Sequence, residues 1–193
     1  VFVIFVAGIL WYANPFAEEV PMLTASTALG ETKEIILPDN SKVILNEKST
    51  LTYPEHFEEV SRLVTLSGEA FFEIQRDEAA MFVAQTKLAD VEVLGTSFNI
   101  DSYPGTTRFE VSVNTGIVQL RPRNSSKTIK MEKGQVGVFN TETKQIYKNW
   151  ANPNTDRWRT GVLSFDDQYL RDVILEIEKE FDIEVILERT DLE

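Results

Sequence analysis

Cysteine is absent from this 193-residue sequence, and histidine occurs once, at His56. Without cysteine the chain has no disulfide, no thiolate zinc site and no cysteine nucleophile. A single imidazole cannot form a multi-histidine metal site, and a Ser-His-Asp triad would depend on His56 alone. Because His56 follows Pro54 at a turn, we interpret it as a solvated surface residue, and we expect no metal and no cofactor.

Basic residues are also scarce, since 19 Lys and Arg stand against 31 Asp and Glu, for a formal net charge of −12. Nucleic-acid recognition depends on clustered Lys and Arg that replace counterions on phosphates, so this class of function is excluded. An acidic chain repels anionic lipid and nucleic acid, and its partners are therefore expected to be proteins. The 42% hydrophobic and 26% charged residues are ordinary for a globular protein with a buried core.

The first twelve residues, Val1–Tyr12, contain no charged side chain. Twelve residues are too few to span a bilayer, which takes about 20. The run ends in Trp and Tyr, which suit a membrane interface, and the next twenty residues include acids but no Lys or Arg, as on a translocated side. We therefore expect the end of a transmembrane helix at 1–13 and a linker at 14–31. A signal-peptide core and a buried strand are the alternatives.

Short runs that alternate apolar and polar residues fill the middle of the chain. Examples are 91–94 (VEVL) and 109–113 (FEVSV), and half-buried strands have this period. Turn residues recur about every ten positions, without a strict repeat. The pattern predicts a mainly β, antiparallel domain over 32–149, either sandwich-like or solenoid-like. Strands are expected at 35–37, 43–45, 63–66, 70–75, 81–86, 91–94, 98–103, 109–113, 117–121, 128–131 and 136–139.

The composition changes after Asn149. Apolar residues at spacings of three and four predict an amphipathic helix over 168–181, with Asp166 and Asp167 at its start as caps. A strand is expected to follow at 183–187. We therefore expect a small, partly truncated α/β module over 156–193, which holds twelve acids and only five bases.

No combination of residues in the sequence specifies a reaction. Glu69 and Glu73 share a strand face if the strand is regular, so a polysaccharide-active enzyme is one alternative. With 31 acids in the chain, however, two neighbouring carboxyl groups are not a specific signal. An exported carbohydrate-binding module is another alternative, but strand periodicity places the aromatic residues in a core rather than in a surface row. We expect a binding protein and not an enzyme.

Several segments, taken in order, resemble the FecR family of bacterial sigma-factor regulators. They are spread over about 110 residues: 37–46 (LPDNSKVILN), 64–74 (VTLSGEAFFEI), 82–86 (FVAQT), 91–100 (VEVLGTSFNI), 116–118 (GIV) and 133–135 (KGQ). Asn40 stands where the family usually has glycine, a change that a turn accepts because Asn adopts positive φ. The segment from Trp158 resembles the terminal domain of Bacteroidetes members, which is related to the signalling domain of secretins and outer-membrane receptors.

The resemblance implies a signal relay in the periplasm. A single-pass protein of the inner membrane would contact an outer-membrane TonB-dependent receptor, of the kind used in iron or glycan uptake. It would control a cytoplasmic ECF-type sigma factor, as an anti-sigma factor, through a segment absent from this chain. Such a relay needs differential affinity for two receptor states and no catalytic group.

Two sets of residues are predicted from these arguments. The core is expected to include Phe71 or Phe72 together with Val93, Phe98, Val111 and Val113. The surface that binds the receptor signalling domain is expected in the C-terminal module, where a free strand edge and an acidic helix face would provide main-chain hydrogen bonds and steering. Its residues are Trp158, Leu163, Phe165, Asp172, Glu176, Ile183, Val185 and Leu187.

Overall fold

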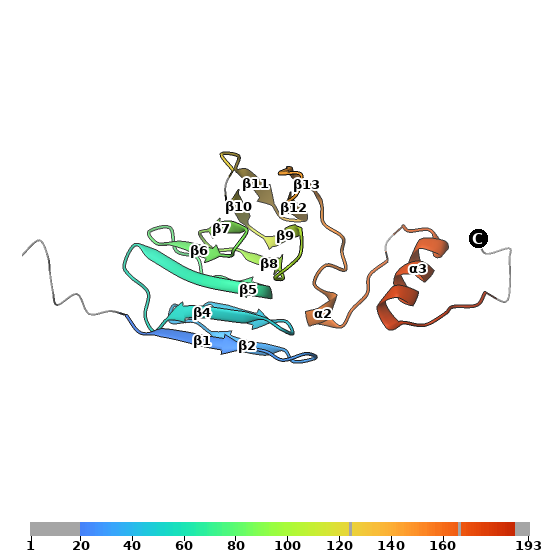
Figure 1. Cartoon of the computed structure of the whole chain (residues 1–193), viewed down its shortest axis with the longest axis horizontal. Helices are drawn as coiled ribbons and strands as arrows, with labels where there is room; N and C mark the ends of the chain where they lie inside the picture. The colour runs from blue at the N-terminus through green and yellow to red at the C-terminus, as the bar shows by residue number, and fades with distance from the viewer. Residues whose placement is uncertain (1–19, 124, 166, 188–193) are drawn as a thin grey trace, which may run out of the picture.

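The structure is a computed structural model that describes residues 20–123, 125–165 and 167–187. Within these ranges, thirteen strands are followed by two helices, and no helix is long and apolar enough to cross a membrane (Figure 1). The expected transmembrane segment, 1–13, lies outside the described residues.

The elements are β1 (Met22–Ser26), β2 (Lys33–Ile36), β3 (Lys42–Leu45), β4 (Thr50–Pro54), β5 (Ser61–Glu73), β6 (Met81–Gln85), β7 (Ala89–Val93), β8 (Ser97–Ser102), β9 (Arg108–Thr115), β10 (Ile117–Pro122), β11 (Ile129–Glu132), β12 (Gln135–Asn140), β13 (Ile146–Trp150), α2 (Arg157–Thr160) and α3 (Leu170–Phe181).

One long strand, β5, belongs to both halves of the sheet. Its first half pairs with β4 and β6, and its second half pairs with β3 and β8. We call sheet A the half in the order β1-β4-β5-β6-β7-β10-β11, and sheet B the half in the order β2-β3-β5-β8-β9-β12-β13. All pairings are antiparallel except that of β5 with β6. The domain is therefore mainly β and antiparallel, as predicted.

Gly68 lies where β5 passes from sheet A to sheet B. Its φ is +105°, a value that L side chains rarely adopt, and a Cβ atom placed there would lie 2.7 Å from the Cα atom of Ser49. This close approach allows the Ser49 hydroxyl to accept a hydrogen bond of 2.8 Å from the Glu69 amide. Only glycine fits both conditions, the positive φ and the near contact with backbone.

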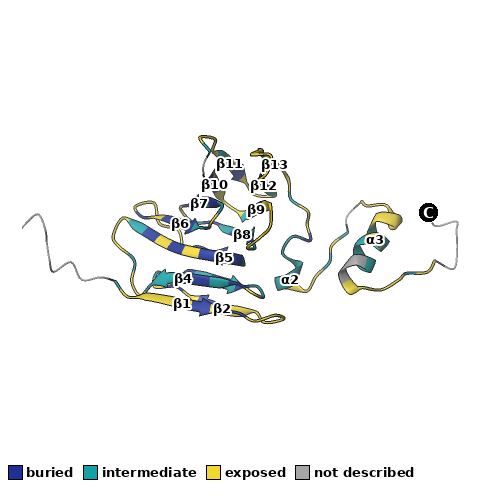
Figure 2. Ribbon diagram, in the orientation of Figure 1, coloured by how far each residue is buried: buried dark blue, intermediate teal, exposed yellow. Residues whose placement is uncertain are grey.

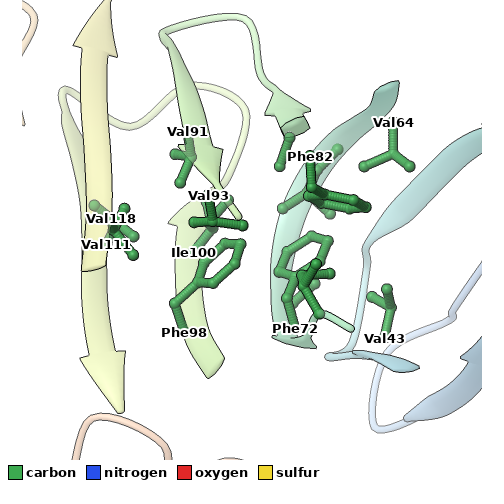
Figure 3. Packing of buried hydrophobic residues seen from close by; sticks show 14 of the residues in the cluster. Val43, Val64, Phe72, Phe82, Val91, Val93, Phe98, Ile100, Val111 and Val118 are labelled. Carbon is green, nitrogen blue, oxygen red and sulfur yellow. The ribbon is translucent and has the colours of Figure 1, made fainter. Parts of the chain in front are cut away.

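The hydrophobic core lies between sheets A and B. Phe72 of sheet B stacks on Phe98, with 5.0 Å between ring centroids, and meets the edge of Phe82 of sheet A at 6.1 Å (Figure 3). Offset and edge-to-face contacts of this kind add to the gain from burial. The predicted core residues are all buried, and both Phe71 and Phe72 are among them. Phe72 belongs to the central cluster, whereas Phe71 does not.

A buried arginine ties two loops to this core. Arg62 lies on the inward face of β5 and is 3% exposed. Its guanidinium donates hydrogen bonds to the backbone oxygens of Ala80 and Gln75 and to the carboxylate of Asp39. A buried charge costs little only when it is paired and fully hydrogen-bonded, and Arg62 meets both conditions. Its position was not predicted, because a basic residue in a strand normally indicates the solvent face.

The observed strands differ from the predicted ones in four places. β1 lies within the segment that the sequence indicated as a linker, 14–31, while β4 and β13 were not expected. The runs at 63–66 and 70–75 form one strand, β5. β1 arises from pairing with the distant β4, which a local pattern does not reveal, whereas β13 pairs with the preceding strand, β12.

The predicted amphipathic helix is present but starts later than expected. α3 begins at Leu170, and its N-cap residue, Tyr169, makes no side-chain capping hydrogen bond. Asp166 lies outside the described residues. Asp167 has φ of +53° and lies two residues before the cap, so it is not placed to bond the first helical amides.

Candidate functional site

The chain after β13 returns to the outer face of sheet B. There the guanidinium carbon of Arg159 lies 3.9 Å from the ring centroid of Phe71, which points outward from β5. Asp156 accepts a hydrogen bond of 3.3 Å from the Asn114 amide of β9. Phe71 is thus buried although it lies outside the central core, because α2 covers it. The cation–π contact and this hydrogen bond attach the C-terminal segment to the sheet.

A polar cavity of about 550 Å³ separates α2 from the rest of sheet B. Glu69 lies in its floor, where its carboxylate accepts hydrogen bonds from the side-chain amides of Asn46 (2.7 Å) and Asn99 (2.8 Å). Burial raises the pKa of Glu69 above its usual value, and the two amides oppose that rise. Burial likewise raises the pKa of the neighbouring Asp101. Trp158 of α2 lines the same cavity, and its buried indole nitrogen faces Glu69 and lowers the pKa of that carboxyl.

The arrangement around Glu69 links elements of the fold. One carboxylate oxygen of Glu69 accepts a hydrogen bond from Asn99 of β8, and the other accepts one from Asn46, the residue after β3. The Glu69 side chain therefore connects three segments of sheet B. Glu73 lies on the same outward face of β5 and is exposed, so the strand is regular as the sequence argument required. His56 is exposed, as predicted. Among the described residues, no group of His, Asp and Glu side chains is arranged to hold a metal ion.

Asn154 connects α2 to α3. It is 3% exposed, its side-chain amide donates a hydrogen bond of 2.9 Å to Glu176 of α3, and its side-chain oxygen accepts one of 2.7 Å from the Ser164 amide. Arg157 adds an ion pair with Glu176 at 3.7 Å. The sequence prediction left Asn154 between the two predicted domains, 32–149 and 156–193, and missed this role. The local sequence, Asn next to Pro, is typical of any turn and does not indicate that Asn154 is buried.

α3 itself has little cover. Figure 2 shows its described residues as intermediate or exposed along its whole length, and none of them is buried. Its apolar stripe starts at Leu170, which is 40% exposed, and ends at Phe181, which is 60% exposed. Apolar spacing of this kind is typical of a helix that packs against another surface. Among the described residues no surface buries this stripe fully, and Val173, Ile174 and Ile177 in its middle are half-buried.

The predicted partner-binding residues fall into two groups. Trp158, Leu163, Phe165, Glu176 and Val185 are half-buried, and the structure brings Trp158 to the carboxylates of sheet B and Glu176 to Asn154. Exposed positions hold the other three: Asp172, Ile183 and Leu187. The structure therefore gathers only part of the predicted set.

The strand predicted at 183–187 is not formed. Two of its backbone amides bind the helix instead, since Ile183 N donates to the Glu178 carbonyl and Val185 N donates to the Glu178 carboxylate at 2.9 Å. The apolar residues at 162–165 also lie outside any strand. A single extended segment cannot form the backbone hydrogen bonds of a β-sheet unless a partner strand lies beside it. The described C-terminal region therefore consists of helices and connecting segments, which corrects the predicted α/β module and its free strand edge.

Comparison with known proteins identifies the class of this domain. Residues 24–119 match the family described as FecR protein. Two crystal structures of an anti-sigma factor candidate from Parabacteroides distasonis ATCC 8503 are similar to it. One, at 2.50 Å resolution, has 33% identity and a TM-score of 0.70, and the match covers 82% of this chain and 74% of that one. The other, at 1.65 Å, has 32% identity and a TM-score of 0.69, with 87% and 79% covered.

The β domain with its attached helices is thus of the kind found in anti-sigma regulators. The chain belongs to the FecR family. No curated protein matches its sequence. The family assignment confirms the resemblance noted in the sequence, and it describes a regulatory class of protein.

Proposed function

We propose that this chain is the periplasmic signal-relay part of an anti-sigma regulator that crosses the inner membrane once, through a helix that ends in residues 1–13. It contacts the signalling domain of an outer-membrane TonB-dependent receptor and controls a cytoplasmic ECF-type sigma factor. The family assignment supports the regulatory role. The chain acts by protein–protein contact and contributes no catalytic step.

The observation that carries this proposal is the apolar stripe of α3, which the described residues cover only in part. A helix with this pattern and with no buried described side chain is not required for the core of the β domain. It is, however, held in a defined position by the bonds from Asn154 and Arg157 to Glu176. A fixed apolar face that is only partly covered and lies next to acidic residues suits partner recognition, because apolar contact provides affinity and charge guides association.

The test is a binding measurement with the signalling domain of the matching receptor. The full chain is compared with a chain that ends at Gly161, which keeps the contact of Arg159 with Phe71 and removes α3. We expect the shortened chain to bind at least about tenfold more weakly, as measured by calorimetry. Equal affinity would place the contact on the β domain and contradict the proposal.

Single variants refine the test. Leu170→Glu and Phe181→Glu place a charge on the apolar stripe and should both weaken binding. Leu29→Glu, at a site that is 70% exposed in the turn between β1 and β2, is the matched control. Because none of these side chains is in the core, all three variants should melt at the temperature of the parent chain.

A further inference from the structure

Sheet A has an apolar stripe on its outer face. Strand register places Leu63 next to Val83, and Ser61 next to Met81, while alternation directs these side chains away from the core. Continuing the same register across β7 and β10 brings Leu94 and Ile117 beside Met81. The exposed members are Met22 (57%), Leu63 (41%), Met81 (43%), Leu94 (39%) and Ile117 (56%).

Hollows deepen this stripe at both ends. One of about 420 Å³ is lined by Met81, Leu94 and Ile117, and one of about 190 Å³ is lined by Met22 and Leu63. Isolated exposed apolar residues are normal on a protein surface, but a contiguous row with hollows is typical of an interaction site. The corresponding face of sheet B is already occupied, since Arg159 covers Phe71 there.

The charges beside the β10–β11 end of the stripe are mainly basic, in contrast with the rest of the chain, whereas Glu58 lies at its other end. The β10–β11 hairpin, residues 117–132, carries four basic residues and one acid, in a chain of net charge −12. Lys127 and Lys130 form no ion pair with another described residue. An occupant of this face should therefore be apolar on one side and acidic beside it.

α3 and its flanks have this chemistry. Residues 167–184 contain seven acids and two bases, and the apolar stripe of α3 is only partly covered by the described residues. Twelve helical residues extend about 18 Å, and four neighbouring strands span about 14 Å between the outermost two. The helix is therefore long enough to cover the row from Leu63 to Ile117 across β5, β6, β7 and β10.

α3 does not reach this face within its own chain. Arg159 attaches α2 to the outer face of sheet B, and Glu176 attaches α3 to Asn154 beside it. The two complementary surfaces thus belong to opposite sides of one molecule. They can meet only between copies unless the Asn154–Glu176 bond opens.

We propose that the outer face of sheet A is the docking site for α3 of a second copy of this chain. The contact is heterologous, because one copy provides the helix and the other the sheet, so repeated association leads to a ring or an open chain. It also occupies the helix face proposed above for the receptor. Self-association and receptor binding would then exclude one another at α3.

The absence of cysteine allows a direct test by disulfide trapping in the full chain. One preparation carries Ile117→Cys and another carries Leu170→Cys; the two are mixed under oxidising conditions and the mixed dimer is measured. Leu29→Cys replaces Ile117→Cys as the matched control, because its side chain is exposed on a different part of the surface. We expect about tenfold more mixed dimer with Ile117→Cys than with the control.

Charge reversal gives a second measurement. Adding Lys127→Glu and Lys130→Glu to the Ile117→Cys chain should lower the yield of mixed dimer about two- to fivefold, which is the effect expected from the loss of exposed ion pairs. Adding Asp172→Lys to the Leu170→Cys chain should restore part of that yield. Equal yields with Ile117→Cys and Leu29→Cys overturn the proposal. A chain that carries both Ile117→Cys and Leu170→Cys and forms the disulfide within itself also overturns the proposal, because its own α3 then covers sheet A. A dominant disulfide dimer of two Ile117→Cys chains overturns it as well, because the sheet of a second copy then covers this face. None of these readouts involves the receptor.

Discussion

Arg62 and Asp39 form an ion pair with 2.7 Å between Nη1 and Oδ2, and the arginine side chain is only 4% exposed. Asp39 also accepts hydrogen bonds from the Ser41 amide and hydroxyl. The turn between β2 and β3 is thereby fixed to the inward face of β5. Asn40 adopts φ of +63° in this turn, which explains how it replaces glycine there.

Removing one partner of this pair should destabilise the domain strongly. Arg62→Ala leaves the Asp39 carboxylate and two backbone oxygens without their donor, and we expect a loss of about 3–5 kcal/mol in the free energy of unfolding. Arg76→Ala is the control, because its pair with Glu78 is 69% and 71% exposed and should contribute less than about 1 kcal/mol. Urea unfolding of both variants measures the difference. A similar small loss for both would contradict the role of Arg62.

Glycine 68 should not tolerate a side chain. Gly68→Ala combines a positive φ with a contact to the Ser49 backbone, and we expect a loss of about 2–4 kcal/mol. Gly105→Ala has a positive φ of +86° but no atom within 4 Å of the new Cβ, so only the conformational cost of about 1 kcal/mol should be seen. If thermal melts showed equal losses of stability for Gly68→Ala and Gly105→Ala, the contact between Gly68 and the Ser49 backbone would make no contribution to stability.

Phe71 and Phe72 should behave differently although both are buried. Phe72→Ala opens a cavity between sheets A and B and should cost about 3–5 kcal/mol. Phe71→Ala removes the surface under Arg159, so it should mainly release the C-terminal segment. Hydrogen exchange should then be faster at residues 157–160 in Phe71→Ala while the amides of β8 and β9 keep their protection. Uniformly faster exchange over the whole domain would contradict this separation.

Stability should depend on the protonation of Glu69. Its pKa is raised in the folded state, chiefly by burial, so the folded chain binds this proton more tightly than the unfolded chain does. The resulting stabilisation is fully present below the usual value of 4.5 and is lost as the pH rises through the raised pKa. The Glu69→Gln variant should therefore gain less stability than the parent chain when the pH is lowered from about 7 to about 5. Melting temperatures at the two pH values test this, and an identical gain in both proteins would show that Glu69 does not contribute.

Much of the β domain follows from local patterns in the sequence. Alternation identified the paired strands β7, β9 and β10, and the predicted core positions Val93, Phe98 and Val111 are buried because each lies on the apolar side of such a strand. The parts that alternation missed depend on distant partners. β1 is an edge strand whose residues are mostly exposed, so it has almost no apolar period, and it exists through its pairing with β4.

The site was harder to predict for the same reason. Composition and helical spacing located α3, but nothing local to Asn154 indicates that it becomes buried and binds Glu176, 22 residues later. The strand expected at 183–187 had suitable residues but no described neighbour with which to pair. The outer stripe of sheet A combines residues from four separate strands and Leu94 just after β7, and only the register of the folded sheet brings them together.

The shared strand β5 also determines how the molecule would respond to tension. Val20 leads into β1 at one end of the domain, and α3 lies beyond the other end (Figure 1). A pull between Val20 and α3 would pass through Arg159 and Phe71 into β5, then through β4 into β1. Because these strands run roughly along the line of force, the hydrogen bonds between β1 and β4 would be loaded in shear and would share the force. Such a domain should transmit a mechanical load along its length instead of unzipping from its edge.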